Sequence, residues 1–181
     1  FERFSIFQYN VMHPDLAAKF PQIKTYTGQG IDDVTATIKL DVTQFGFHAM
    51  IRSSKGDVYI DPYNQNTVNY YMSYERKNLI RQNSFECLLA DETAMEIQNA
   101  NGNTVQRTNG TQLRTYRLAL ACTGEYAAFY GGTVSGAMAG MVTTMNRVNG
   151  VYESELSIRM VMVANNNLIV YTNSSTDPFT N

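Results

Sequence analysis

The residues that most often bind metals or transfer protons are few in this sequence. It contains two histidines, His13 and His48, which lie far apart along the chain. Neither has a Cys, His, Asp or Glu at the spacing that zinc sites use. His48 falls among Phe45, Phe47 and Met50 on an expected strand, which favours packing or a surface contact. We therefore expect no metal ligand and no catalytic residue in this chain.

Serine and glutamate side chains near a long helical pattern also predict structure rather than catalysis. Ser135 follows Gly131-Gly132-Thr133, which lacks the Lys and the glycine spacing of a phosphate-binding loop. We expect a turn there, with the Ser135 hydroxyl capping the helix that follows. Acid–base catalysis by paired carboxyl groups requires two of them to converge on one substrate, and no spacing here predicts that. Solvated surface positions are expected for Glu125, Glu153 and Glu155.

The two cysteines, Cys87 and Cys122, leave two interpretations open. In an oxidising compartment they pair as a disulfide. Otherwise each packs in the interior as a small hydrophobic side chain.

Charge and composition narrow the class of protein. The 181-residue chain has a formal net charge of −2, with 44% hydrophobic and 17% charged residues, which is typical of a globular protein. Lys and Arg are scattered, so we expect no nucleic-acid partner. No apolar run approaches the roughly 18 residues of a membrane span, so we expect none. The opening residues FERFSIFQYN do not form a signal peptide and look like part of a trimmed chain.

Residues 113–171 contain the clearest pattern of secondary structure. Strand-like runs at 113–122 and 157–164 flank a helical pattern at about Val134–Leu156, and a third short strand is expected at Leu168–Tyr171. The apolar residues on one face of this helix are Val134, Met138, Met141, Met145, Val148 and Tyr152. A helix that joins two strands of one sheet makes a parallel, right-handed crossover. We expect a β-α-β unit with the methionines in its core.

Two glycines of this helix, Gly136 and Gly140, lie four residues apart. Each costs about 1 kcal/mol in helix propensity relative to Ala. We expect them to let the helix approach its sheet closely.

Residues 1–110 are predicted to form a separate β-rich module. An edge strand or extended arm is expected at 1–11, followed by a short helix from His13 to Phe20. Thr25–Asp33 contains two glycines and is predicted as a loop. From Val34 the polar and apolar residues alternate, which predicts antiparallel strands with a turn at Ser53–Asp57.

The rest of this module continues the pattern to a polar boundary. We expect Pro62 to stop one strand, and we expect turns at Asp32-Asp33 and Asp61-Pro62-Tyr63. Strands are predicted at Asn69–Tyr74 and Phe85–Leu89, and Asn101-Gly102 predicts a hairpin.

Thr108–Gln112 is the best boundary between the two parts and the expected site of processing. The predicted class is α+β: an antiparallel β-rich module at 1–110, then a β-α-β segment with one long helix at 111–181.

Three stretches of this β-α-β unit carry a family resemblance. TYRLALACTGEY, TTMNRVNGVYE and IRMVMVANN resemble the start of the catalytic domain of reprolysin-like (adamalysin-type, metzincin) zinc metallopeptidases of Bacteroidetes, over about Leu113–Asn181. Upstream, PDLAAKFPQIKTYTGQGIDD, FGFHAM and VYIDPY look like the propeptide of the same secreted peptidases. The resemblance implies a propeptide plus the N-terminal part of the catalytic domain, truncated before the zinc-binding motif.

The resemblance also implies a chemistry that this sequence does not hold. In that family a His-Glu-x-x-His-x-x-Gly-x-x-His helix binds zinc, and its Glu is the general base. This sequence contains no His-Glu pair, so no catalytic residue can be carried over. What is implied is a secreted zymogen, a hydrolase that uses zinc and takes protein substrates only in its full-length form. This chain is expected to be inactive, with the remainder of the catalytic domain as its partner.

A third interpretation of Cys87 follows from the resemblance. Many metzincins stay latent through a propeptide cysteine bound to zinc, and Cys87 lies in SFECLL of the propeptide-like part. The usual Pro- and Gly-flanked motif is absent. A latency ligand, a bridge to Cys122 and a buried thiol therefore remain open.

Two alternative functions belong to other classes of protein. The first is an inhibitory or chaperone module formed by residues 1–110. The second is a non-catalytic secreted adhesion or carbohydrate-binding domain, to which the Tyr- and Asn-rich strands would belong.

Overall fold

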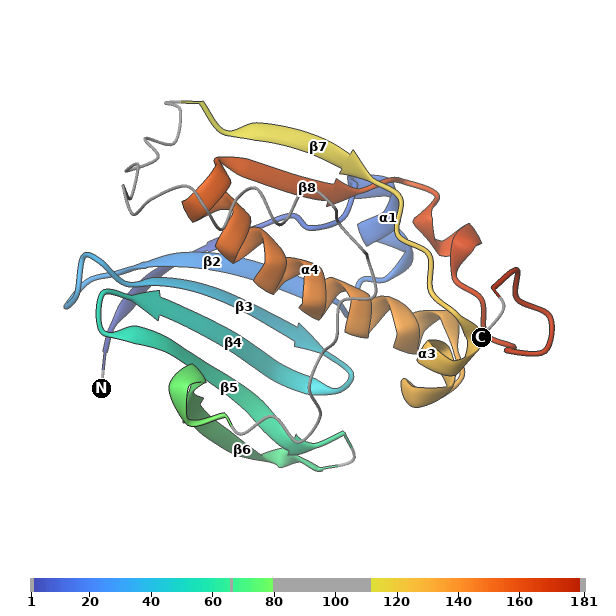
Figure 1. The fold of residues 1–181 in the computed structure, drawn as a ribbon, viewed down its shortest axis with the longest axis horizontal. Helices are drawn as coiled ribbons and strands as arrows, with labels where there is room; N and C mark the ends of the chain where they lie inside the picture. Colours follow the sequence, from blue (N-terminus) through green and yellow to red (C-terminus); the bar gives the residue numbers. More distant parts are fainter. Residues whose placement is uncertain (1, 66, 80–111, 180–181) are drawn as a thin grey trace, which may run out of the picture.

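The computed structural model describes residues 2–65, 67–79 and 112–179. These residues form a six-stranded antiparallel sheet, a two-stranded parallel sheet and a long helix between the two (Figure 1). The helices and strands are β1 (Phe4–Gln8), α1 (Pro14–Lys19), β2 (Lys24–Gly30), β3 (Thr37–Thr43), β4 (Gly46–Ser53), β5 (Gly56–Asn64), β6 (Thr67–Glu75), η1 (Arg76–Asn78), β7 (Arg114–Leu118), α3 (Gly124–Phe129), α4 (Val134–Leu156), β8 (Ile158–Met162) and η2 (Asn166–Ile169). The predicted α+β class is confirmed.

The six-stranded sheet is a meander in which each strand pairs antiparallel with the next, from β1 to β6. The predicted turn at Ser53–Asp57 joins β4 to β5, where Ser53 pairs with Gly56. Gly56 has a φ of 119°, a backbone conformation that glycine adopts at little cost. Short turns of this kind keep neighbours in the sequence adjacent in the sheet.

The predicted loop at Thr25–Asp33 is wrong, because most of it forms β2 in the sheet. Gly28 lies opposite Ile6 on one side and Ile38 on the other. A Cβ atom at Gly28 would come within 2.6 Å of the Ile6 Cδ1 atom. This glycine therefore marks close packing in a strand and not the loop that the sequence predicts.

The prediction that Pro62 stops a strand is also wrong, since β5 continues through it to Asn64. The register between β5 and β6 shifts between Pro62 and Asn64. Proline cannot donate to the strand ladder, so it is tolerated at such an irregularity.

The β-α-β unit is confirmed, with β7 and β8 parallel and α4 spanning the expected residues. The short helix α3 was not predicted. Gly131 and Gly132, with φ of 84° and 69°, make the predicted turn between α3 and α4. The third strand expected at Leu168–Tyr171 is wrong: η2 extends to Ile169, and Val170 forms a single bridge to Cys122.

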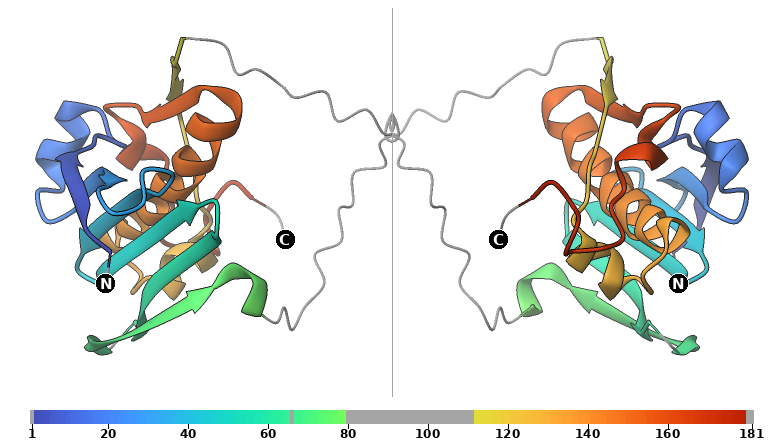
Figure 2. Two further views of the ribbon diagram at one scale, coloured as in Figure 1. Left: turned by 90° about the vertical axis from the view of Figure 1, so that its left-hand side faces the viewer. Right: turned by 90° about the vertical axis from the view of Figure 1, so that its right-hand side faces the viewer.

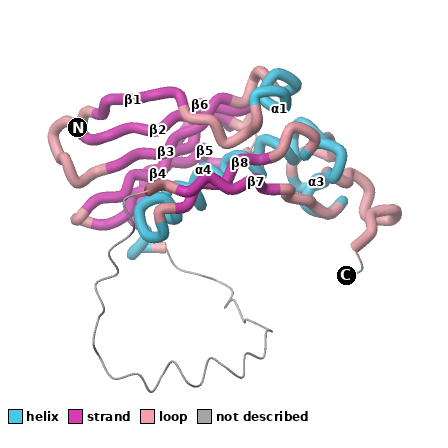
Figure 3. Tube along the Cα trace, turned by 90° about the horizontal axis from the view of Figure 1, so that it is seen from above, coloured by secondary structure: helices cyan, strands magenta, loops and turns pink. Residues whose placement is uncertain are grey.

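Helix α4 lies between the two sheets, with β3 and β4 on one side and β8 on the other (Figures 1 and 3). Met138, Met141 and Met145 are buried, which confirms the core methionine face. Tyr152 departs from that face and is 38% exposed.

Gly136 and Gly140 of α4 do not face the sheet, contrary to the expectation that they let the helix approach it. A Cβ at Gly140 would lie 2.4 Å from the Tyr130 ring, and one at Gly136 would meet the Tyr130 carbonyl oxygen, so both contact the α3–α4 turn. The glycine that approaches the sheet is Gly150, where a Cβ would lie 2.5 Å from the Met50 Cε atom.

The chain after β1 joins the N-terminal part to the second sheet. The backbone of Val11 and His13 hydrogen-bonds to Met162 of β8. One hydrophobic core contains residues from both parts of the chain, including Leu16 and Phe20 of the first and Met138 and Met162 of the second. Figure 2 shows α1 beside β8 from two sides.

Several predictions lie outside the described residues: the strand at Phe85–Leu89, the hairpin at Asn101-Gly102 and all of the Thr108–Gln112 boundary except Gln112.

Candidate functional site

The two histidines lie in different parts of the molecule. His13 caps α1, where its Nδ1 accepts a hydrogen bond from the Asp15 backbone at 3.3 Å. His48 is on β4 and contacts Asp41. Within residues 2–65, 67–79 and 112–179, no three His, Cys, Asp or Glu side chains gather as metal ligands do. The described residues therefore do not fit a zinc ion.

Cys122 lies in the core, at the bridge to Val170. Its thiol contacts the Tyr171 carbonyl oxygen at 3.9 Å, and burial raises the pKa of this thiol. Cys87 lies outside the described residues. The bridge and the latency role both remain predictions.

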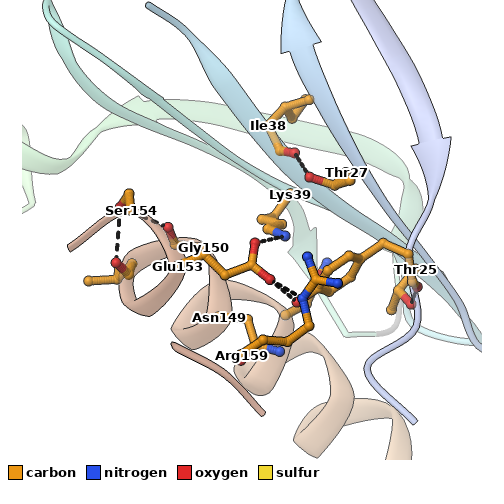
Figure 4. A network of polar contacts seen from close by, with 12 residues as sticks. Thr25, Thr27, Ile38, Lys39, Asn149, Gly150, Glu153, Ser154 and Arg159 are labelled. Carbon is orange, nitrogen blue, oxygen red and sulfur yellow. Dashed lines mark hydrogen bonds and ion pairs between the residues drawn. The ribbon is translucent and has the colours of Figure 1, made fainter. Parts of the chain in front are cut away.

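A network of polar contacts joins α4 to both sheets around Glu153 (Figure 4). Its Oε2 accepts a hydrogen bond from the Lys39 ammonium on β3 at 2.7 Å. Its Oε1 accepts from the Tyr9 hydroxyl at 2.7 Å and from the Arg159 guanidinium on β8. Lys39 also lies 3.5 Å from the centre of the Tyr9 ring, a cation–π contact. One carboxylate of the helix thus binds groups from both sheets.

Burial and hydrogen bonding compete at this carboxylate. Burial alone would raise the pKa of Glu153, but donation by Lys39, Tyr9 and Arg159 outweighs it and lowers that pKa. Burial lowers the pKa of Lys39, against the opposing effect of Glu153. Glu153 receives three donors, two of them cationic, so we take it to be ionised at neutral pH with Lys39 as its counter-ion.

The expectation of three surface glutamates is therefore wrong for Glu153, whose side chain is 18% exposed. Glu155 and Glu125 are exposed as expected. Glu155 pairs with Arg52 of β4 at 2.7 Å, at the edge of the same interface.

A second polar cluster centres on Asp41 of β3, which is 1% exposed. Its Oδ2 accepts from the Thr143 hydroxyl of α4 at 2.7 Å and lies 3.2 Å from the Nδ1 of His48. Asn146 of α4 donates to the Leu40 carbonyl oxygen at 3.0 Å. Thr143 and His48 both bind the same carboxylate, so the imidazole is not placed to take a proton from the hydroxyl. This cluster joins the helix to the sheet.

Sequence reasoning missed Asp41 and Lys39. They alternate with Leu40 in β3, so they share one face of the strand. A polar face is normally interpreted as the solvated one, but here α4 covers it. Charges of opposite sign at alternate positions of one strand were the available signal.

A third cluster corrects the turn predicted at Asp61-Pro62-Tyr63. Asp61 lies in β5, where its Oδ1 binds the Arg147 guanidinium of α4 and its Oδ2 accepts from the Tyr74 hydroxyl at 2.7 Å. Burial, with the hydrogen bond to Asp61, raises the pKa of Tyr74 to about 12. The turn predicted at Asp32-Asp33 is confirmed, with Asp33 accepting from the Thr35 backbone at 2.9 Å.

The predicted cap at Ser135 is wrong. Thr133 caps α4, since its hydroxyl accepts from the Gly136 backbone at 3.0 Å. The Ser135 hydroxyl instead accepts from the Gln22 amide at 2.8 Å.

Along the described stretches of the chain, no helix combines the length and the apolar character needed to cross a bilayer.

Taken together, these clusters bind the six-stranded sheet to α4 through charges that are paired with one another. Such an arrangement suits the positioning of one segment on another. Comparison with known families adds one finding: residues 112–181, less than half of the chain, match the family model described as Metallo-peptidase family M12B Reprolysin-like. Searches of curated proteins and of solved structures gave no match. The matched segment, with β7, α4 and β8, is similar to part of a metallopeptidase.

Proposed function

We propose that this chain is part of the precursor of a secreted zinc metallopeptidase, in which residues 1–110 are the propeptide. The family match over residues 112–181 supports the peptidase assignment. The 181 residues contain no His-Glu-x-x-His motif, so the metal ligands and the general base of the proposed enzyme belong to another part of the precursor. The chain as it stands is then inactive.

The observation that carries the role of the first part is the Glu153 cluster. Lys39 and Tyr9 of the propeptide-like part hold a carboxylate of the peptidase-like part, with Lys39 only 7% exposed. A buried ion pair often adds little net stability, and in some proteins its role is to fix how two segments fit together, which is the role that we propose here. The six-stranded sheet thereby acts as the template against which α4 and β8 are positioned during folding.

The first experiment extends the polypeptide. The reading frame after Asn181 is searched for His-Glu-x-x-His, and the extended and 181-residue proteins are compared for bound zinc and casein hydrolysis. We expect zinc and chelator-sensitive hydrolysis in the processed, extended protein alone. Hydrolysis that survives complete removal of metal would overturn the assignment, as would a reading frame without the motif. Recovery of the enzyme from the culture medium checks secretion.

An inhibitory role of residues 1–110 is the second candidate, and it is compatible with the first. The same cluster favours it, because Lys39 and Tyr9 keep the propeptide-like part bound to α4. We expect Lys39→Met in the extended precursor to raise peptidase activity before processing, with no change after processing. Equal activity of the two unprocessed precursors, at equal folded fraction, would argue for a folding role alone.

A further inference from the structure

A cavity of about 490 Å³ lies between α4 and the strands β4 and β5. Its volume is in the range of sites that take small ligands, roughly 300–1000 Å³. It opens beside the shift in register between Pro62 and Asn64 on β5. Irregularities of this kind are frequent next to binding sites, because they interrupt the strand and redirect its side chains.

The lining of the cavity combines two kinds of side chain. Its apolar wall includes the rings of Phe45 and Tyr130, whose centres lie 5.5 Å apart. Its polar wall contains His48, Asp61 and Arg147. An occupant therefore needs both an apolar group and hydrogen-bonding groups.

The charges of the polar wall are already neutralised within the protein. Arg147 is paired with Asp61, and His48 contacts the buried carboxylate of Asp41. A ligand with a full charge would meet no free counter-ion in this wall and would lose its hydration. The cavity therefore favours an uncharged occupant.

His48 and Arg147 each keep hydrogen-bonding groups that Asp41 and Asp61 do not use. The Asp41 carboxylate, which also accepts from Thr143, contacts the Nδ1 of His48, so the Nε2 of this imidazole is the ring nitrogen left for an occupant. Arg147 binds Asp61 through one terminal nitrogen, and the guanidinium has further N–H donors. Hydrogen-bonding groups of this kind can pair with the N–H and C=O of peptide groups.

We propose that this cavity binds an uncharged peptide segment of another protein, with one apolar side chain against Phe45 and Tyr130 and with adjoining peptide groups hydrogen-bonded to His48 and Arg147. The site does not depend on whether the chain belongs to a peptidase. It is formed by residues of both parts of the chain, so it exists only when α4 is docked on the sheet.

The absence of tryptophan from the chain makes a direct test possible. The probe is N-acetyl-tryptophan amide, which carries a peptide group on each side of one apolar side chain, and its fluorescence is excited where only tryptophan absorbs. We expect saturable binding to the 181-residue chain with a shift of emission to shorter wavelength. N-acetyl-tryptophan, an anion, and tryptophan amide, a cation, should bind at least tenfold more weakly. Binding that is not saturable, or equal affinity for the charged probes, would overturn the proposal.

Two variants locate the site and test the peptide contacts. Thr144→Phe fills the cavity from an exposed position on α4 and should weaken binding at least tenfold, whereas Thr115→Phe, the same change on β7, should leave it unchanged. His48→Leu should lower the affinity for N-acetyl-tryptophan amide more than that for 3-methylindole, which has the ring but no peptide group. Thermal unfolding shows whether each variant is folded. Unchanged affinity of folded Thr144→Phe would place the probe elsewhere, and an equal loss for both ligands in His48→Leu would refute peptide recognition.

Discussion

The two halves of α4 are held by different forces. From Val134 to Met145 the helix buries Met138 and Met141 in the shared core. From Asn146 to Leu156 it binds the sheets mainly through polar side chains, with Glu153 contacting Lys39 at 2.7 Å and Asn149 donating to the Met160 carbonyl oxygen at 2.8 Å. A single helix thus has an apolar end and a polar end.

The two kinds of contact fix the position of the helix to different degrees. Apolar packing is non-directional and tolerates small shifts along or around the axis. In the second half, the hydrogen bonds that join Glu153 to Lys39 and Asn146 to the Leu40 carbonyl oxygen require one register of the helix against β3. We infer that the first half supplies most of the stability and the second half most of the specificity of docking.

The largest expected effect is that of Glu153→Ala. It leaves the buried Lys39 ammonium without its carboxylate, and removing one partner of a buried ion pair costs about 3–5 kcal/mol in the free energy of unfolding. Urea denaturation of the 181-residue chain measures it. Glu155→Ala is the matched control, since Glu155 also pairs with a cationic side chain of the sheet, Arg52, but is exposed. Its loss should stay under about 1 kcal/mol.

The double variant Lys39→Met with Glu153→Leu tests whether the charged pair itself stabilises the fold. Replacing both charges with apolar side chains should recover most of the stability lost in Glu153→Ala, because well-packed apolar groups often match a buried ion pair. The specificity of docking should suffer, which appears as broadened amide resonances of α4. A double variant as unstable as the single one would show that the pair itself supplies stability.

The next effect concerns the apolar half. Met138→Ala removes a side chain with no exposed surface and should cost roughly 2–5 kcal/mol by leaving a cavity. Met72 of β6 is 42% exposed, and Met72→Ala should change stability by less than about 0.5 kcal/mol. If the two losses are equal, the methionine face of α4 is not the core that the structure shows.

Acid should weaken the polar half selectively. The pKa of Glu153 is lowered from its ordinary 4.5 in the folded protein, so the unfolded chain binds a proton more readily as pH falls. The contribution of Glu153 to stability is present above about pH 4.5 and is lost as pH falls through the folded-state pKa. The loss should be smaller than that in Glu153→Ala, since a protonated carboxyl still accepts hydrogen bonds. The pH dependence of unfolding should be shallower below pH 4.5 in Glu153→Gln, and an unchanged slope would contradict the assignment.

The difference between the apolar and the polar half of α4 also explains which features the sequence could predict. The bounds of α4 and its methionine face follow from local periodicity, and so do the hairpin turns with their glycines. The clusters around Glu153, Asp41 and Asp61 do not, because their partners lie about a hundred residues away and only the fold brings them together. Gly28 and Pro62 misled because their neighbours across the strands, not their own propensities, decide their roles. The cavity could not be predicted either, because its lining residues come from segments far apart in the sequence.

The smallest effect tests the cap at the start of the apolar half. Thr133 accepts a hydrogen bond from the Gly136 backbone, and losing such a cap costs about 1 kcal/mol. Ser135, the residue that the sequence favoured, accepts only from the side-chain amides of Gln22 and Gln44 among the described residues. Thr133→Ala should therefore destabilise the chain more than Ser135→Ala in urea denaturation, and amide exchange should accelerate in the first turn of α4 only in the former. The reverse order would make Ser135 the cap in solution. It would also show that local rules at this helix end predict better than the tertiary contacts do.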